Sequence, residues 1–429
     1  MNILMVTNTY SPHVGGVAKS VEAFTKEYRR RGHRVIVIAP IFKGAPEWEE
    51  DVIRVPAIQQ FNGSDFSVRI PIPGLLTVAL DDFVPDIVHS HHPFLLGDTA
   101  FLLAARENAP LVFTHHTLYE QYTHYVPGDS PELQRFVVEL STGYANLCDL
   151  VFAPSESIAS LIKTRGTRTP VEAVPTGVNL EQFSKGDGTK FRKRYGIPPD
   201  AFLVGHVGRL APEKNLDFLA RAVLRFLEEC ESAWFLVTGE GPSKERILAR
   251  FGEARLLHRL VLTGTLVGGD LVDAYHAMEV FAFASKTETQ GMVLTEALAA
   301  SCPVVALDAP GAREVVQSGL NGHLVYHETI DAFASALHWI YTKTGKEKET
   351  LREAARTTAR QFSLDRCASR SLELYEGLLK SDPEKREIED SMWSGAMRMI
   401  ESEWEIWLNR AHAAGAAFIP PSQNSSRDG

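Results

Sequence analysis

Cysteine is scarce in this sequence, and the cysteines that occur are widely spaced. The chain has 429 residues but only four cysteines, and none of them forms a Cys-x-x-Cys pair: Cys148, Cys230, Cys302 and Cys367. Zinc sites and redox motifs use closely spaced cysteines, and small secreted domains use many of them. The sequence therefore predicts neither a zinc site nor a disulfide framework, and it favours a reducing, cytoplasmic setting.

Long apolar runs and an excess of positive charge are also missing. No stretch approaches the roughly 18 apolar residues of a membrane-spanning helix, and the N-terminus begins as a strand rather than as a signal peptide. The formal net charge is −10, which argues against general binding to nucleic acids or to anionic membranes. We expect a protein that neither spans a membrane nor is secreted by a classical signal.

Two ligand-binding motifs are missing as well. The Gly-x-Gly-x-x-Gly fingerprint of dinucleotide-binding proteins does not follow the first expected strand, where only the adjacent pair Gly15-Gly16 occurs. No Asp-x-Asp pair is present to hold a magnesium-bound diphosphate, and the histidines at 89–92 and 115–116 have no cysteine or acid at ligand spacing. These absences count against a nicotinamide oxidoreductase, and we expect no metal site.

What the chain does contain is a regular alternation of short apolar runs and helical stretches. Its length suits two domains of about 150 to 200 residues. The expected strands of the first domain are Ile3–Thr7, Val35–Ala39, Ile53–Val55, Ile87–His89, Leu111–Thr114, Leu150–Ala153 and Val171–Val174. Those of the second are Leu203–Val207, Trp234–Thr238, Val261–Thr263, Val280–Ala284, Val304–Leu307 and Gly322–Val325. Apolar strands that alternate with helices indicate parallel sheets buried on both faces, so the predicted fold class is α/β with two Rossmann-like domains.

A change of composition marks the boundary between these domains. Residues 175–183 mix proline, glycine and polar residues, a basic run follows them, and Pro198-Pro199 precede the next expected strand. We expect a first domain at 1–178, a linker at 179–200, a second domain at 201–362 and an additional C-terminal region at 381–429.

A stripe of large apolar side chains distinguishes the C-terminal region. Six residues share one face of an expected helix: Trp393, Met397, Ile400, Trp404, Trp407 and Ala411. Acidic residues outnumber basic ones there, which disfavours docking on anionic lipid. We expect this helix to pack against the body of the protein or to form a homo-oligomer through 384–415, and we expect a disordered tail after Phe418.

The most informative stretch runs from residue 285 to residue 305. An apolar strand precedes it, Gly291 lies in its loop, and a helix is expected at 293–300. The unpaired amides at a helix start attract anions such as phosphate. Glu288 and Glu296 add carboxylates, which accept hydrogen bonds from vicinal hydroxyls. A ligand with both phosphates and sugars is therefore indicated, although acids near a helix start also act simply as partners of the helix dipole.

Basic residues follow the first strand of the second domain. Arg209 and Lys214 stand where a doubly wound sheet binds its ligands and are able to reach a diphosphate, although isolated bases at such positions are often only solvated. Gly239 follows the next strand, either as a wall of the same site or as a glycine that only the turn requires. In the first domain, His116 follows a strand end, a position that suits hydrogen bonding to sugar or acceptor hydroxyls.

Together these segments resemble the retaining glycosyltransferases of family 4, over roughly residues 1–380. The resemblance rests on the Glu-x7-Glu spacing of Glu288 and Glu296, on Gly-Arg-x4-Lys-Asn at 208–215, and on the Gly-Gly-Val loop at 15–17. The fold of that family is GT-B, in which two Rossmann-like domains face each other across a cleft. The resemblance also implies that a return helix at 363–380 crosses back to the first domain.

The resemblance implies a role for each matching residue. In the family, the carboxylate matching Glu288 binds the hydroxyls of the donor sugar, and the one matching Glu296 binds the nucleotide ribose. The implied catalytic set is His116, Arg209, Lys214 and Glu288, with His116 matching a histidine that lines the active centre. The implied donor-binding set is Gly15, Gly16, Gly239, Gln290, Gly291, Met292, Val293 and Glu296.

The residues around the first carboxylate indicate a subfamily. Many members have Glu-Gly-Phe-Gly where this chain has Glu-Thr-Gln-Gly at 288–291, and this variant, with His116-Thr117, most resembles bacterial glucosyltransferases that glycosylate diacylglycerol. The resemblance implies UDP-glucose as the donor substrate, no cofactor, and a lipid acceptor reached peripherally at the inner face of the plasma membrane. The bases Lys19, Lys26 and Arg29–Arg31 suit that approach, but they are equally compatible with a solvated helix face. Ser301 departs from the glycine that is common in the family.

The expected reaction is metal-independent. No carboxylate is placed as a covalent nucleophile, so attack on the face that the diphosphate leaves, assisted by the leaving phosphate, is the preferred mechanism. Several alternatives stay open. In one alternative the reaction is the same but the acceptor is a sugar, a polysaccharide or a small molecule. In another, the chain is a nucleotide-sugar-binding protein without catalytic activity. No nucleic-acid partner is expected.

Overall fold

The chain divides into two compact units by the contacts between its residues. Unit 1 comprises Met1–Val174 and Ala368–Gly429, and unit 2 comprises Pro175–Cys367. The structure, a computed structural model, describes residues 1–13, 15–58, 68–69, 80, 82–123, 129–381, 405–406, 409–410 and 412–413.

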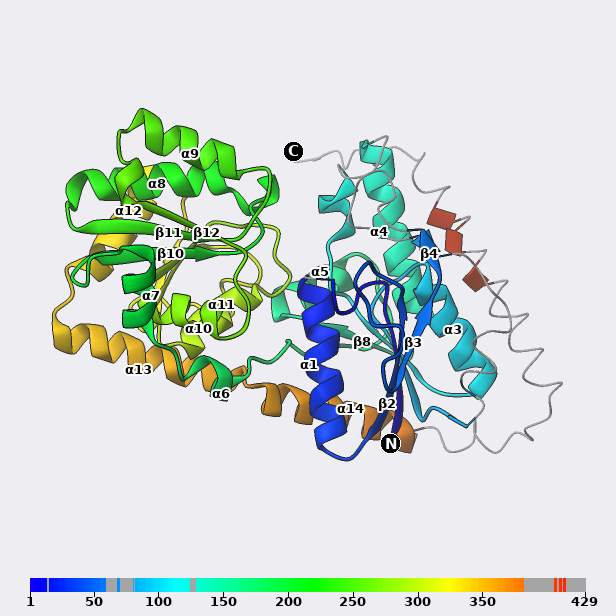
Figure 1. The fold of residues 1–429 in the computed structure, drawn as a ribbon. Coiled ribbons are helices and arrows are strands. Elements are labelled where there is room, and N and C mark those ends of the chain that lie inside the picture. Colours follow the sequence, from blue (N-terminus) through cyan, green and yellow to red (C-terminus); the bar gives the residue numbers. More distant parts are fainter. Residues whose placement is uncertain are drawn as a thin grey trace, which may run out of the picture. The chain divides into compact units, whose positions relative to one another are not determined.

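Unit 1 is built on a seven-stranded parallel sheet in the order β3-β2-β1-β6-β7-β8-β9. Figure 1 labels β2, β3 and β8 of this sheet and the helices α1, α3, α4 and α5 of the same unit. Its strands are β1 (Asn2–Val6), β2 (Arg34–Pro40), β3 (Val52–Val55), β6 (Ile87–Ser90), β7 (Leu111–Thr114), β8 (Leu150–Ala153) and β9 (Val171–Ala173). A short antiparallel pair is formed by β4 (Ala57–Ile58) and β5 (Val68–Arg69). The helices are α1 (Gly16–Arg30), α3 (Leu96–Glu107), η2 (Tyr119–Gln121), α4 (Pro131–Asn146) and α5 (Glu156–Thr164).

The long helix α14 (Leu364–Ser381) begins in unit 2 and belongs to unit 1 from Ala368 onward. Buried hydrogen bonds attach its second part to unit 1. The Tyr375 hydroxyl lies 2.6 Å from Nδ1 of His89, and the Tyr28 hydroxyl lies 2.6 Å from Oγ of Ser371. The rings of Phe152 and Tyr375 also stack at 5.8 Å. Polar bonds inside an apolar contact fix one orientation of the helix, because any other would leave these groups unpaired.

Unit 2 contains a six-stranded parallel sheet in the order β12-β11-β10-β13-β14-β15. Its strands are β10 (Phe202–Val207), β11 (Ala233–Thr238), β12 (Leu260–Gly264), β13 (Val280–Phe283), β14 (Val304–Leu307) and β15 (Gly322–Val325). Its helices are α6 (Leu180–Phe183), α7 (Gly188–Tyr195), η4 (Pro212–Lys214), α8 (Leu216–Glu229), α9 (Lys244–Glu253), η5 (Leu257–Arg259), α10 (Gly268–Ala277), α11 (Met292–Ala299), α12 (Ile330–Tyr341) and α13 (Gly345–Gln361).

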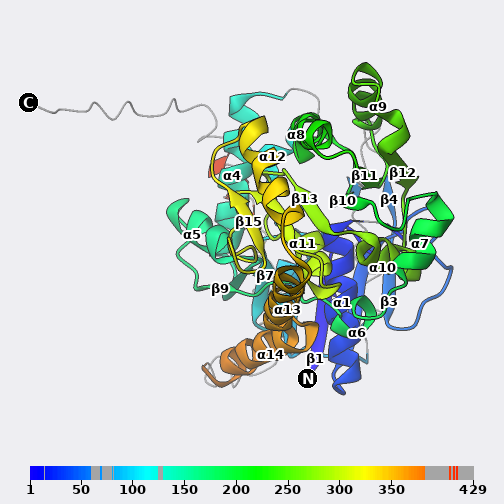
Figure 2. The same cartoon turned by 90° about the vertical axis from the view of Figure 1, so that its left-hand side faces the viewer.

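Helices cover both faces of the unit 2 sheet (Figure 2). The core on one face is formed with α8 and α12, and the core on the other with α7, α10, α11 and α13. Consecutive strand residues alternate between them, since Leu203 packs in one core and Val204 in the other. The expected α/β class with two parallel sheets is confirmed.

The segment 179–200, expected to be a linker, is folded into unit 2. It forms α6 and α7, and Phe183 and Phe191 are buried in the core. The basic composition of α7 suggests an exposed segment, but Arg192 in this helix is buried. It pairs with Glu279 at 2.6 Å and donates to the carbonyls of Ala277 and Ala201. A buried guanidinium whose donors are used does not need water.

Ser301 finds an explanation in the backbone. It follows α11 with a φ of 65°, in the left-handed region that favours glycine. Its hydroxyl accepts a hydrogen bond of 3.1 Å from Nη1 of Arg356 on α13. A serine at this position therefore loses backbone freedom relative to glycine but gains a contact between two helices.

The C-terminal region is only partly described. Trp393, Met397, Ile400, Trp404, Trp407, Ala411 and the tail after Phe418 lie outside the described residues. Of the described ones, Ile406 is buried in the core of unit 1, Asn409 donates to the carbonyl of Leu140 at 3.2 Å, and Arg410 pairs with Asp98. The expectation of a homo-oligomer through 384–415 stays a prediction. Within the described ranges, no helix combines the length and apolar character that a membrane span requires.

We expect Tyr375→Phe to lower the free energy of unfolding by about 1–3 kcal/mol, because it leaves the buried His89 ring nitrogen without its partner. Urea unfolding followed by circular dichroism measures this. Tyr326→Phe is the matched control, since Tyr326 is 69% exposed. Equal unfolding midpoints for the two variants would contradict the role given to this hydrogen bond.

Candidate functional site

The candidate residues of unit 2 gather at one edge of its sheet. The neighbouring strands β10 and β13 are parallel, so both end at the same edge. The loop after β10 carries Arg209 and Lys214, and the loop after β13 carries Glu288 and leads into α11. Ligands of open parallel sheets bind at such carboxyl ends.

A largely buried ion pair joins these two loops. Nζ of Lys214 lies 2.5 Å from Oε1 of Glu288, and the two side chains are 17% and 19% exposed. Burial raises the pKa of the Glu288 carboxyl, but the charge and hydrogen bond of Lys214 outweigh it and hold the pKa below its usual value of 4.5. Glu288 is therefore an anion at neutral pH. Lys214 has three N–H donors, so it can keep this partner and still bind a phosphate oxygen.

Arg209 is held on the same loop by an ion pair with Glu213. The main-chain carbonyl of Glu213 accepts hydrogen bonds from the hydroxyls of Ser285 (3.4 Å) and Thr287 (3.5 Å). The loop after β10 is thus bonded to the loop after β13 by main-chain as well as side-chain contacts. Arg209, Lys214 and Glu288 therefore lie on two loops that are bonded to each other.

Gly239, at the end of β11, allows another loop to approach. A Cβ atom at this position would lie 1.9 Å from the carbonyl oxygen of Gly208, and its φ is 137°. Leu210 donates to the carbonyl of Glu240 at 2.8 Å, next to this contact. Gly239 is required for the packing of these two loops, and a contact of Gly239 with a nucleotide stays a prediction.

Gly291 starts the helix α11. Its φ of 70° suits glycine, and its carbonyl accepts a hydrogen bond from Leu294. The amides of Met292 and Val293 belong to the first turn, where no intrahelical acceptor exists. This turn can therefore donate to an anion at the same sheet edge as Lys214.

Glu296 lies one turn further along α11 and is buried. The hydroxyl of Tyr275 on α10 donates to its Oε2 at 2.8 Å. Burial raises the pKa of Tyr275 well above its usual value of 10.0, and the charge of Glu296 raises it further, so the hydroxyl remains a donor. Tyr275 was not among the residues expected from the sequence, because nothing in the spacing of α10 distinguishes it from a core tyrosine.

His206 is a second residue that the sequence analysis missed. It is buried near the end of β10, and its Nδ1 lies 3.1 Å from the carbonyl oxygen of Ala282. Burial lowers its pKa to about 4, so the ring is neutral at neutral pH, and Nδ1 carries the proton that it donates. Nε2 has no hydrogen-bond partner among the described residues.

Gln290 is placed differently from the other donor-binding candidates. Its side-chain amide pairs at both ends with the main chain of Thr176. A contact of Gln290 with the donor stays a prediction, and in this structure the side chain binds the main chain of Thr176 instead.

The candidates of unit 1 lie at the ends of its strands. Nε2 of His116 is 2.9 Å from Nδ1 of His91, and the two rings stack at 5.2 Å. Desolvation lowers the pKa of both histidines well below the usual 6.5, so this pair is neutral at neutral pH. Gly15 and Gly16 lie at the start of α1. In the part of the chain that the structure describes, no group of three or more His, Cys, Asp and Glu side chains is arranged to hold a metal ion.

Two family models match the chain. One, described as Glycosyltransferase Family 4, matches residues 14–182, and the other, described as Glycosyl transferases group 1, matches residues 187–358. The alpha-monoglucosyldiacylglycerol synthase of Streptococcus pneumoniae is 28% identical over 347 residues, covering 79% of this chain and 78% of that protein. The GDP-mannose-dependent alpha-mannosyltransferase of Corynebacterium glutamicum is 27% identical over 356 residues, covering 79% of this chain and 80% of that protein.

A solved structure has the same fold. The Anabaena protein HepE, in complex with UDP, matches with a TM-score of 0.70 and 21% identity, covering 88% of this chain and 100% of the other. The expected GT-B fold is thereby confirmed. Because both family models match, and together they span most of the chain, the protein belongs to glycosyltransferase family 4 and transfers a sugar from a nucleotide sugar.

Proposed function

We propose that this glycosyltransferase moves glucose from UDP-glucose to a diacylglycerol-type lipid, with retention of the anomeric configuration and without a metal ion. The observation that carries the proposal is the Lys214–Glu288 pair beside the start of α11. It offers a carboxylate for sugar hydroxyls next to cations and amides for a diphosphate.

Each part of the donor has a matching group in unit 2. Glu288, kept ionised by Lys214, accepts hydrogen bonds from the glucose hydroxyls. Arg209, Lys214 and the amides of Met292 and Val293 bind the diphosphate. Glu296, oriented by Tyr275, accepts from the ribose hydroxyls.

The reaction itself needs charge stabilisation at the leaving group. The bond between C1 of glucose and the diphosphate oxygen breaks, and the acceptor hydroxyl forms a new bond to C1 on the same face. The hydroxyl proton passes to the leaving phosphate oxygen, which becomes part of UDP. The cationic and amide groups stabilise the negative charge that develops there, and one such group is typically worth about 3 kcal/mol.

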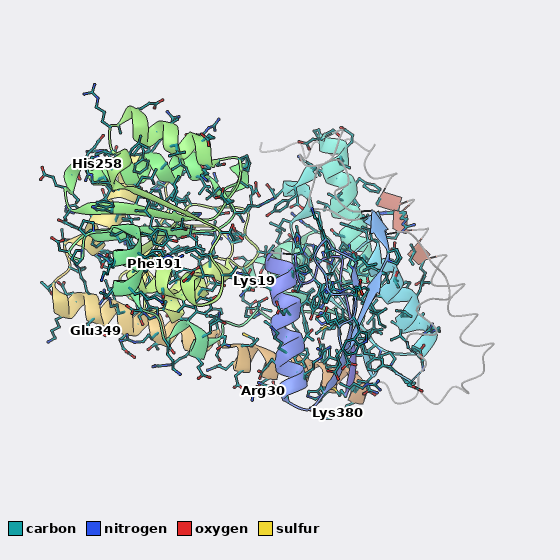
Figure 3. All side chains as sticks on the ribbon, viewed as in Figure 1. Lys19, Arg30, Phe191, His258, Glu349 and Lys380 are labelled. Atoms are coloured by element: carbon teal, nitrogen blue, oxygen red, sulfur yellow. The ribbon has the colours of Figure 1, made fainter. Side chains whose placement is uncertain are left out.

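The acceptor is supported by resemblance more than by geometry. The relative from Streptococcus pneumoniae is a glucosyldiacylglycerol synthase, and the Glu-Thr-Gln-Gly segment at 288–291 fits that subfamily. The bases of α1 give less support, because Lys26 pairs with Glu22, and Arg30 and Arg31 pair with Glu27. Figure 3 shows Lys19 and Arg30 toward opposite ends of α1.

One alternative has a specific observation behind it. The relative from Corynebacterium glutamicum is a GDP-mannose-dependent mannosyltransferase at nearly the same identity. A mannosyl donor and a different acceptor are therefore the second candidate function.

A panel of nucleotide sugars, assayed in EDTA with and without diacylglycerol micelles, tests the proposal. We expect UDP-glucose with lipid to give an α-linked glucosyl lipid, identified by mass spectrometry and NMR. Turnover of GDP-mannose instead supports the alternative. A β-linked product refutes retention, and activity lost in EDTA and restored by a divalent cation refutes metal independence.

We expect Lys214→Ala to lower kcat about 10²- to 10³-fold, because it removes one cation from the leaving diphosphate. Steady-state transfer assays with saturating UDP-glucose measure this effect. Lys346→Ala on α13 is the matched control, since Lys346 is exposed. A loss below threefold in Lys214→Ala would exclude this role, given the cost of about 3 kcal/mol expected for one such group.

The pH dependence of donor binding tests the state of Glu288. In the unaltered protein its pKa lies below 4.5, so the affinity advantage of UDP-glucose over UDP persists until the pH falls through that value. In Lys214→Met, burial acts without the opposing cation and the pKa rises above 4.5. We expect the advantage to disappear at a higher pH in the variant, as measured by calorimetry. Both UDP-glucose and UDP lose the phosphate contact of Lys214 in the variant, so this loss cancels in the ratio of their affinities. The ratio then reports on the sugar alone, which UDP lacks. An unshifted ratio would show that Glu288 does not bind the sugar.

A further inference from the structure

The side chain of Gln290 makes a two-point bond that no donor-binding role explains. The Thr176 amide donates to Oε1 of Gln290 at 2.7 Å, and Nε2 of Gln290 donates to the Thr176 carbonyl at 2.6 Å. Both residues are buried. A side-chain amide has the donor and acceptor that this pairing needs, in the geometry of a peptide group.

The main chain of Gln290 is held from a different direction. A Cβ atom at Gly311 would lie 2.7 Å from the carbonyl carbon of Gln290, and the φ of Gly311 is 81°. Two backbones pack here without a side chain between them. The side chain of Gln290 is bonded to Thr176 while its main chain packs against that of Gly311, so a displacement of Thr176 must move Gln290 or break the pair.

Thr176 lies where the chain enters unit 2. The first segment of unit 1 ends at Val174. Val178, two residues after Thr176, is bonded to residues 362–364, which precede the return of the chain to unit 1. Val178 donates to the carbonyl of Phe362 at 2.8 Å, and Leu364 donates to the carbonyl of Val178 at 2.9 Å. We call segments 175–178 and 362–364 the crossing pair. The chain passes between the units beside these segments and nowhere else in the sequence.

We propose that Gln290 is a positioning residue that couples the donor loop, residues 285–291, to the crossing pair. This proposal rests on the proposed function, because the donor loop carries Glu288. A movement of one unit against the other acts on the crossing pair, and the bonds of Thr176 pass it to Gln290. Gln290 is two residues from Glu288 and adjoins the start of α11, so the groups that bind sugar and diphosphate shift with it.

The chemistry of the pair defines a selective variant. In Gln290→Glu, an ionised carboxylate accepts from the Thr176 amide but repels the Thr176 carbonyl. A protonated carboxyl has one donor and one acceptor and restores both bonds. Burial raises the pKa of such a carboxyl, so restoration occurs as the pH falls through a value above the usual one.

The first experiment compares Gln290→Glu with Gln361→Glu, which adds the same charge at an exposed position in unit 2. At about pH 8 we expect the transfer kcat of Gln290→Glu to fall about tenfold or more, with a larger share of UDP-glucose lost to hydrolysis. At about pH 5.5 the ratio to the unaltered protein should recover to within about threefold. Gln361→Glu should match the unaltered protein at both values. A ratio that does not change with pH, or an unchanged share of hydrolysis, overturns the coupling.

Hydrogen exchange separates this proposal from the proposed function. In the unaltered protein we expect UDP-glucose to slow exchange in peptides covering 285–292 and in those covering 175–178. Gln290→Met keeps the size of the side chain but not its hydrogen bonds to Thr176. In this variant, UDP-glucose should protect only the peptides covering 285–292. Equal protection of 175–178 in both proteins overturns the coupling.

A readout without donor completes the test. If the unaltered protein neither binds nor uses any nucleotide sugar, the proposed function fails, and the coupling is judged on the unliganded protein alone. There, Gln290→Met must accelerate exchange of the Thr176 amide by about tenfold or more, since it removes the acceptor of that amide. Unchanged exchange of this amide overturns the coupling.

Discussion

The candidate donor site depends on the ion pair between Lys214 and Glu288, and the parallel sheet makes that pair possible. The two residues are 74 positions apart in the sequence. They meet because β10 and β13 are neighbours that run in the same direction and end at the same edge. Neither charge is well tolerated alone at this degree of burial, since an unpaired buried ion loses its hydration without compensation. Each loop therefore needs the other to keep its buried side chain, Lys214 or Glu288, charged and in place.

Burial disfavours the charged form of a side chain in both units, but the outcome differs with the partner. In unit 2, the cation beside Glu288 overcomes burial and keeps the carboxylate ionised. In unit 1, desolvation lowers the pKa of His91 and His116, and both are neutral at neutral pH. The candidate site of unit 2 thus carries charges, whereas the His91–His116 pair of unit 1 carries uncharged donors and acceptors. The same physical rule, applied to different partners, gives the units different chemistry.

Much of the fold and of the site follows from local patterns. Continuous apolar runs predicted the strands because both faces of a parallel sheet are buried, and the glycine at 291 with the following helix predicted an amide cradle. The helices within segment 179–200 were not apparent from its basic composition, because the burial of Arg192 depends on carbonyls and a carboxylate contributed by residues far away in sequence. Tyr275 and His206 were missed for a similar reason. A tyrosine or histidine in an apolar segment has the same local pattern whether or not it touches a functional carboxylate or lies at a sheet edge.

Apolar runs and motif spacing are local properties of the chain, so the amino-acid sequence alone was enough to predict the α/β class, the two sheets and the family. The partners of the candidate site residues, by contrast, depend on the folded structure. It gave Gln290 the main chain of Thr176, gave Glu296 the hydroxyl of Tyr275, and gave the left-handed Ser301 an arginine from α13. Each of these partners is at least 21 residues away in the sequence. Hydrogen bonds and ion pairs act over a few ångströms, so only the folded chain can determine which distant groups come within their reach.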